Sequence, residues 1–167
     1  PGTAGYGVKR ESVNSSIASL RPMSEHAYRT AGGTPLYDSI DAAIEDLKKV
    51  PDFADPSVSF VVMAITDGHD EHSRLRASVL ATKIRELQNS DRWTFVLRVP
   101  NGYRAAISRE LSLHAGNVQE WNTTDAGLRD STIGTQTAVN AFYSARSLGQ
   151  TSTKSFYSAN LGGVSTT

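Results

Sequence analysis

Residues 58–68 read VSFVVMAITDG and include the longest apolar run of the chain. The run from Val58 to Ile65 is almost continuously apolar and rich in β-branched residues. This pattern is typical of a parallel strand that helices cover on both faces. The run ends at Thr66-Asp67-Gly68, a polar turn. We therefore expect a buried strand with Asp67 directly after its carboxyl end.

A helix is predicted just before this strand. Apolar residues repeat at helical spacing from Leu36 to Leu47, and Pro35 suits the first turn of a helix. Thr34 is the expected cap of its amino terminus. Because Pro51 disfavours helical geometry in the residue before it, we expect the helix to end near Val50.

The same alternation continues after the strand. Apolar spacing predicts helices over 75–87 and 104–114 and a long helix over 128–145, with strands at 93–99 and 118–121. A strand, helix, strand order implies a right-handed parallel crossover, so strands 58–65 and 94–99 should be parallel neighbours. The predicted class is α/β, a Rossmann-like and mostly parallel sheet with helices on both faces.

The two ends of the chain differ from this middle part. Residues 6–17 carry scattered apolar residues and suit a half-exposed edge segment. Residues 149–167 are rich in Ser, Thr and Gly, and we expect this tail to wrap the surface or to lead into a further segment. The expected organisation is one domain over 1–148 and a tail over 149–167.

Composition excludes several classes of function. The 167 residues include 17 Lys or Arg and 17 Asp or Glu, so no net charge draws the chain to nucleic acid. No apolar run approaches the roughly 20 residues that a membrane helix needs. The absence of cysteine excludes disulfides and Cys-ligated metals, and it favours a reducing compartment such as the cytoplasm. The oligomeric state is left open.

The candidate ligand site lies at one edge of the predicted sheet. In a parallel sheet, ligands bind just beyond the carboxyl ends of the strands. Asp67 follows such a strand, and Thr34 precedes a helix after the Gly32-Gly33 pair. The alternative interpretations are structural, with Thr34 as a helix cap and Asp67 as a turn residue. Together, the two side chains could converge on one ion.

Two segments in order resemble the von Willebrand factor type A domains. Residues 28–40, YRTAGGTPLYDSI, are similar to that family's Gly-Gly-Thr-Pro/Ala-Leu-Tyr-Asp-Ala-Ile segment, and residues 61–68 are similar to its apolar strand ending in Thr-Asp-Gly. Residues 93–99, 105–106 and 121–124 resemble the bacterial and phage branch. The resemblance covers roughly residues 8 to 148 and leaves the tail outside.

The resemblance implies a metal-ion-dependent adhesion site. In this family a Mg²⁺ ion on the sheet crest leaves one position open for a carboxylate of a protein partner, and hard oxygen ligands suit this ion. Thr34 and Asp67 match two of the family's ligand positions. The family's Asp-x-Ser-x-Ser motif on its first, central strand has no counterpart here. Residues 130–134, DSTIG, approximate it poorly and lie in a helical pattern. We expect an upstream segment or another chain to supply that strand.

Two functions from different classes follow. The first is a non-enzymatic interaction module that recognises a protein partner through Mg²⁺ bound with Thr34 and Asp67. The alternative is a metal-free scaffold component of a larger assembly, such as a virion or a secretion complex. A metal-dependent hydrolase using His69, Asp70 and His72 is a weaker hypothesis, because this segment is predicted to be a solvated loop before a helix. No nucleophile elbow or phosphate-binding loop accompanies it.

Overall fold

Three parallel strands form the centre of the computed structural model, which describes residues 12, 15–21 and 33–158. The strands are β1 (Phe60–Ile65), β2 (Trp93–Pro100) and β3 (Val118–Trp121), in the spatial order β1-β2-β3. The α-helices are α1 (Leu36–Leu47), α2 (Ala77–Gln88), α3 (Arg104–Glu110) and α4 (Asp125–Ser147). Short 3₁₀ helices occur at Ile17–Ser19, Pro51–Ala54 and Ala115–Asn117. The chain is therefore an α/β protein with a Rossmann-like sheet.

The predicted parallel pairing is confirmed. Phe60 of β1 is aligned with Trp93 of β2, and the register continues to Ile65 beside Arg98. On its other side β2 pairs in parallel with β3, from Leu97 beside Val118. All eight residues of β2 are buried, as expected of a central strand covered on both faces.

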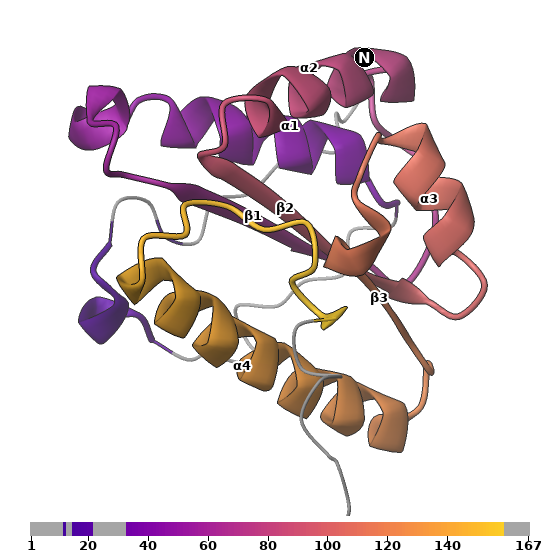
Figure 1. Cartoon of the computed structure of the whole chain (residues 1–167). Coiled ribbons are helices and arrows are strands. Elements are labelled where there is room, and N and C mark those ends of the chain that lie inside the picture. Colours follow the sequence, from indigo (N-terminus) through magenta and orange to yellow (C-terminus); the bar gives the residue numbers. More distant parts are fainter. Residues whose placement is uncertain (1–11, 13–14, 22–32, 159–167) are drawn as a thin grey trace, which may run out of the picture.

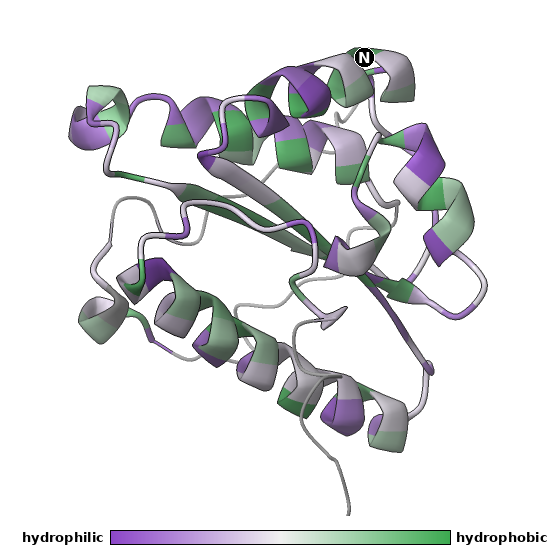
Figure 2. Ribbon diagram, in the orientation of Figure 1, coloured by the Kyte–Doolittle hydropathy of each residue, from purple (hydrophilic) through white to green (hydrophobic). Residues whose placement is uncertain are grey.

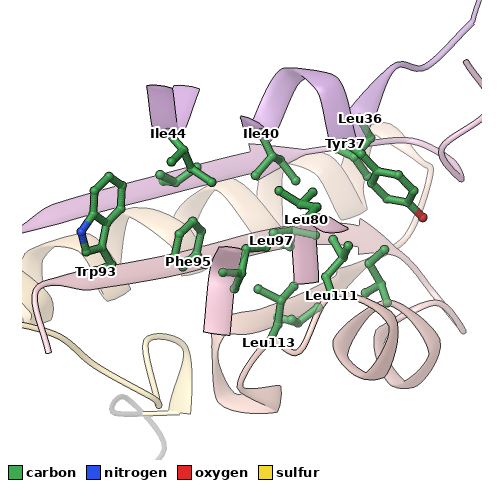
Figure 3. Close-up of a cluster of buried hydrophobic side chains, with 14 of the residues drawn as sticks. Leu36, Tyr37, Ile40, Ile44, Leu80, Trp93, Phe95, Leu97, Leu111 and Leu113 are labelled. Carbon is green, nitrogen blue, oxygen red and sulfur yellow. The ribbon is translucent and has the colours of Figure 1, made fainter. Parts of the chain in front are cut away.

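The main hydrophobic core lies between the sheet and helices α1, α2 and α3. Figure 3 shows side chains of α1 pointing toward β2, and Figure 2 shows hydrophobic patches of α1 turned toward the sheet. Ile44, Leu80 and Phe95 are at most 1% exposed at its centre. Burying a side chain of this size contributes about 1.5–3 kcal/mol, so this cluster fixes α1 against the sheet. The cluster comprises Leu36, Tyr37, Ile40, Ile44, Phe60, Val62, Leu80, Ile84, Trp93, Phe95, Leu97, Val99, Ile107, Leu111, Leu113 and Val118.

Helix α4 covers the opposite face of the sheet (Figure 1). Its Ala138 and Phe142 pack with Val96 of β2 and with Phe156 from the segment after the helix. That segment is held by hydrogen bonds, because the Thr153 amide donates to Thr94 Oγ1 at 3.1 Å and the Phe156 amide donates to Asn117 Oδ1 at 2.8 Å. The described part of the predicted tail therefore packs on this face of the sheet.

Strand β1 is less covered than the sequence predicts. Within the described residues it pairs only with β2, and no described strand lies along its other edge. Val61 and Ile65 are 37% and 56% exposed, and both point to the face that α4 covers over β2 and β3. The expectation of a strand buried on both faces is therefore wrong for these two positions. The physical reason is that no described element packs over them.

The chain ends contribute little to the described structure. The edge segment predicted over residues 6–17 lies almost wholly outside the described residues, as do Gly32 and residues 159–167 of the tail. Where the structure is described, none of the helices combines the length and apolar character needed to cross a lipid bilayer.

Candidate functional site

Helix α1 begins one residue later than its predicted cap implies. Pro35 occupies the cap position, and no side chain of the cap residue bonds to the helix. The prediction that Thr34 caps this helix is therefore wrong. The first amide groups are satisfied from elsewhere: Tyr37 N donates to Asp70 Oδ1 at 3.1 Å, and Asp38 N donates to Ser73 Oγ at 3.0 Å. These acceptors perform the capping role that local sequence assigns to Thr34.

The loop after β1 is bound tightly to the start of α1. The Asp38 carboxylate accepts two hydrogen bonds from this loop, from the amides of Arg74 and Leu75 at 3.0 and 2.9 Å. Within the loop, Ser73 Oγ donates to Asp70 Oδ1 at 2.5 Å. Carboxylates that accept backbone N–H groups make hydrogen bonds stronger than neutral ones, so the network fixes the loop against the helix.

Thr34 and the loop that begins at Asp67 meet at the carboxyl end of β1. The Glu71 amide donates to the Thr34 carbonyl at 3.1 Å, which joins the two segments directly. Gly33, at φ +84°, lets the His72 imidazole lie against its backbone, where a Cβ atom would come within 2.4 Å of Nδ1. The fold thus brings the segments of both predicted ligand residues to one end of the sheet.

The polar side-chain groups of the two predicted ligands are not committed to other contacts within the described structure. Thr34 is half-buried and Asp67 is exposed. Across the residues that the structure describes, neither the Thr34 hydroxyl nor the Asp67 carboxylate forms a hydrogen bond or an ion pair. The neighbouring Thr66 differs, since its Oγ1 donates to the Gly68 carbonyl at 2.8 Å. Thr34 and Asp67 therefore offer two hard oxygen donors that no other described group uses.

These donors fit part of a magnesium site. Mg²⁺ is octahedral, usually keeps several waters and is held in proteins by only one or two carboxylates. A hydroxyl and a carboxylate at one crest suit that chemistry. No group of three or more His, Cys, Asp or Glu side chains that could hold a metal occurs among the described residues. The remaining ligands of such a site would be waters, neutral oxygens such as backbone carbonyls, or groups from outside the described residues.

The histidine-rich segment 69–72 does not form one cluster. The Asp70 carboxylate accepts from α1 and Ser73, and the His69 ring lies 4.2 Å from the Tyr103 ring between centroids. His72 turns instead toward Gly33. The three side chains of the hydrolase hypothesis thus serve different contacts. Likewise, the candidate motif at 130–134 lies inside α4, on the sheet face opposite α1.

A second group of polar side chains gathers at the same end of the sheet. The hydroxyl of Tyr37 interacts with Glu110 of α3, and burial, then Glu110, then Asp70 raise the pKa of that tyrosine well above its usual range. A cavity of about 20 Å³ beside it is lined in part by His69, Tyr103 and Glu110. This space holds about one water molecule, so it is too small for a substrate. No sequence motif indicated this group, although Tyr103, directly before α3, and Glu110, its last residue, are seven residues apart and so lie on one side of the helix.

A larger groove runs along the open edge of β1. It has a volume of about 250 Å³ and lies between α1 and the strand. Phe60 N donates to the Arg92 carbonyl and Thr66 N donates to the Arg98 carbonyl, so by alternation the backbone groups of Val61, Met63 and Ile65 point away from β2. The groove is lined by Thr34, Pro35, Leu36, Ser39, Ile40, Ala43, Val62, Met63, Ala64, Ile65 and Thr66.

Comparison with known proteins identifies no relative, since no family model, no curated protein and no solved structure matches the chain.

Proposed function

We propose that this chain is a protein interaction module of the von Willebrand factor type A kind, which recognises a carboxylate of its partner through Mg²⁺ at the carboxyl end of β1. The observation that carries the proposal is the pair of uncommitted oxygen donors, Thr34 and Asp67, on segments joined by the Glu71 to Thr34 hydrogen bond. Nearby Asp and Thr side chains are committed to backbone groups, since Asp38 accepts from the Arg74 amide and Thr66 Oγ1 donates to the Gly68 carbonyl. In open α/β sheets, ligands bind just beyond the carboxyl ends of the strands, which is where the segments of Thr34 and Asp67 meet.

Each residue at this end of the sheet would have a distinct role in binding the cation. Asp67 supplies negative charge that attracts the cation, and the Thr34 hydroxyl supplies a neutral oxygen. The Asp70, Ser73 and Asp38 network keeps the loop after β1 in place, so the crest is preorganised before a partner arrives. When bound, Mg²⁺ would supply a positive centre for the partner's carboxylate.

Thermal melting in MgCl₂ tests the proposal. A ligand that binds only the folded state stabilises it by RT ln(1 + [L]/Kd), about 1.4 kcal/mol at ten times Kd. For a domain of this size, 1 kcal/mol raises the melting temperature by about 2–4 °C. We expect a rise of a few degrees for the unaltered chain and none for Asp67→Ala or Thr34→Val. Asp130→Ala, which removes an exposed carboxylate on α4, should keep the full rise. Equal shifts in all four proteins would contradict the proposal.

A metal-free scaffold is the second candidate, and the open edge of β1 favours it. The outward backbone groups of Val61, Met63 and Ile65, next to an apolar groove, suit the addition of a strand from another segment or chain. In that case the chain would contribute a rigid block to a larger assembly. Melting that does not respond to magnesium, together with chain association that depends on β1, would favour this function over the first.

A further inference from the structure

Arg98 is a buried cation without an anionic partner. It lies in the middle of the sheet, aligned with Ile65 of β1 and Gln119 of β3, and is 3% exposed. An arginine side chain stays charged at any ordinary pH, and burying an unpaired charge costs several kcal/mol. No ion pair within the described part of the chain joins Arg98 to a carboxylate. Its charge therefore requires another explanation.

Most of the hydrogen-bonding capacity of this guanidinium is unused. Nη2 donates to Ser131 Oγ of α4, whose own hydroxyl donates to the Leu128 carbonyl at 3.0 Å. Nε is buried and has no acceptor among the described residues. A guanidinium presents five N–H donors in a planar fork that matches the oxygens of a carboxylate or phosphate. The free donors therefore point to an oxyanion.

Tyr157 provides a second buried donor near this cation. Its hydroxyl oxygen is buried and, within the described structure, has no hydrogen-bonding partner of ordinary geometry. Tyr157 packs against the cluster of Val96, Ala138, Phe142 and Phe156 on the α4 face of the sheet, the face on which Arg98 contacts Ser131. Burial raises the pKa of Tyr157, while neighbouring Thr135 and the charge of Arg98 lower it. The Thr135 hydroxyl donates to the Ser131 carbonyl at 2.8 Å, so its proton is not available to the Tyr157 oxygen. Two unsatisfied buried donors thus share one face of the sheet.

Solvent approaches this region from the side of β1. Ile65, the register partner of Arg98 and on the same face, is 56% exposed, and Leu128 of α4 is 45% exposed. The covering of the sheet is therefore incomplete one strand away from the guanidinium.

We propose that Arg98 and Tyr157 form an oxyanion-binding site on the α4 face of the sheet, which takes a phosphate-type anion or a carboxylate. Such a group would accept a paired hydrogen bond from the guanidinium and another from the Tyr157 hydroxyl. It would also neutralise the buried charge, so binding and folding stability should be linked. The site does not use Thr34, Asp67 or magnesium, and the interaction-module proposal can fail without affecting it.

Titration calorimetry and thermal melting test this site. The unaltered chain is titrated with sodium phosphate and, separately, with sodium acetate, against sodium chloride at matched ionic strength. Either anion should bind at one site per chain and raise the melting temperature, and both effects should be lost in Arg98→Met. Arg109→Met removes an exposed arginine of α3 and should leave both effects unchanged.

The two titrations also separate the sources of the oxyanion. Binding of phosphate alone identifies a free phosphate-type ligand, and binding of acetate as well identifies a site that accepts a carboxylate from a protein segment. If Arg98→Met does not fold, Tyr157→Phe replaces it, and we expect its apparent Kd to rise about tenfold, as loss of a hydrogen bond to a charged group implies. Absence of binding by both anions, or equal melting shifts in the unaltered chain and Arg98→Met, would overturn the proposal.

Discussion

Single residues at the crest show how backbone geometry limits what the site can tolerate. Gly33 has a left-handed φ of +84°, and the His72 imidazole occupies the space that a Cβ atom would need. Gly102 has a similar φ of +88°, but no atom lies within 4 Å of its virtual Cβ. A comparison of substitutions at Gly33 and Gly102 therefore distinguishes the effect of backbone strain from that of a steric clash.

We predict that Gly33→Ala destabilises the chain by about 2–4 kcal/mol and Gly102→Ala by about 1 kcal/mol. Both substitutions place alanine in a left-handed backbone conformation, which it disfavours, but only Gly33→Ala must also displace the His72 side chain. Urea denaturation measures both values. Equal losses in the two variants would show that His72 does not press on Gly33.

Asp70 has a structural role that can be distinguished from that of a metal ligand. Its Oδ1 accepts from Tyr37 N and Ser73 Oγ, so it is an acceptor for the first turn of α1. We predict that Asp70→Ala lowers the free energy of unfolding by about 1–2 kcal/mol, in urea denaturation, with or without magnesium. Asp130→Ala, on an exposed part of α4, should change it by less than about 0.5 kcal/mol. A loss for Asp70→Ala that appears only in the presence of magnesium would instead make Asp70 a metal ligand.

At the scale of elements, β1 differs most from its sequence-based prediction. Its composition is that of a central strand, yet within the described residues it is an edge strand with Val61 and Ile65 exposed. An apolar, β-branched run with a free edge favours pairing with a further strand. The groove between α1 and β1 lies beside that edge.

Amide hydrogen exchange tests the open edge. We predict slow exchange at Val62 and Ala64, whose N–H groups point toward β2, and fast exchange at Val61, Met63 and Ile65. Two-dimensional amide spectra recorded after transfer to D₂O resolve these residues. Slow exchange at all five would show that another segment or a second chain pairs with β1.

For the whole molecule, the sequence predicts the α/β class and the parallel neighbours β1 and β2, because long apolar runs and helical spacing report burial directly. It does not predict the capping of α1. Asp70 and Ser73 are more than 30 residues from Tyr37 and Asp38, the α1 residues whose amides donate to them, and only the folded chain brings them together. The sequence also does not predict that Arg98 is buried, since one charged residue within the apolar run 93–99 is compatible with an exposed side chain. The positions of the Thr34 and Asp67 segments were predictable, because both follow from the strand order.

Paramagnetic broadening of amide signals tests the proposal that Thr34 and Asp67 bind a divalent cation. Mn²⁺ shares the octahedral oxygen preference of Mg²⁺, and it broadens nearby amide signals even when only a small fraction of the protein is bound. In spectra of ¹⁵N-labelled protein with substoichiometric MnCl₂, we predict broadening at Thr34, Asp67 and Gly68 that excess MgCl₂ reverses and that Asp67→Ala abolishes. Unchanged signals at these residues, or equal broadening in Asp67→Ala, would contradict the claim.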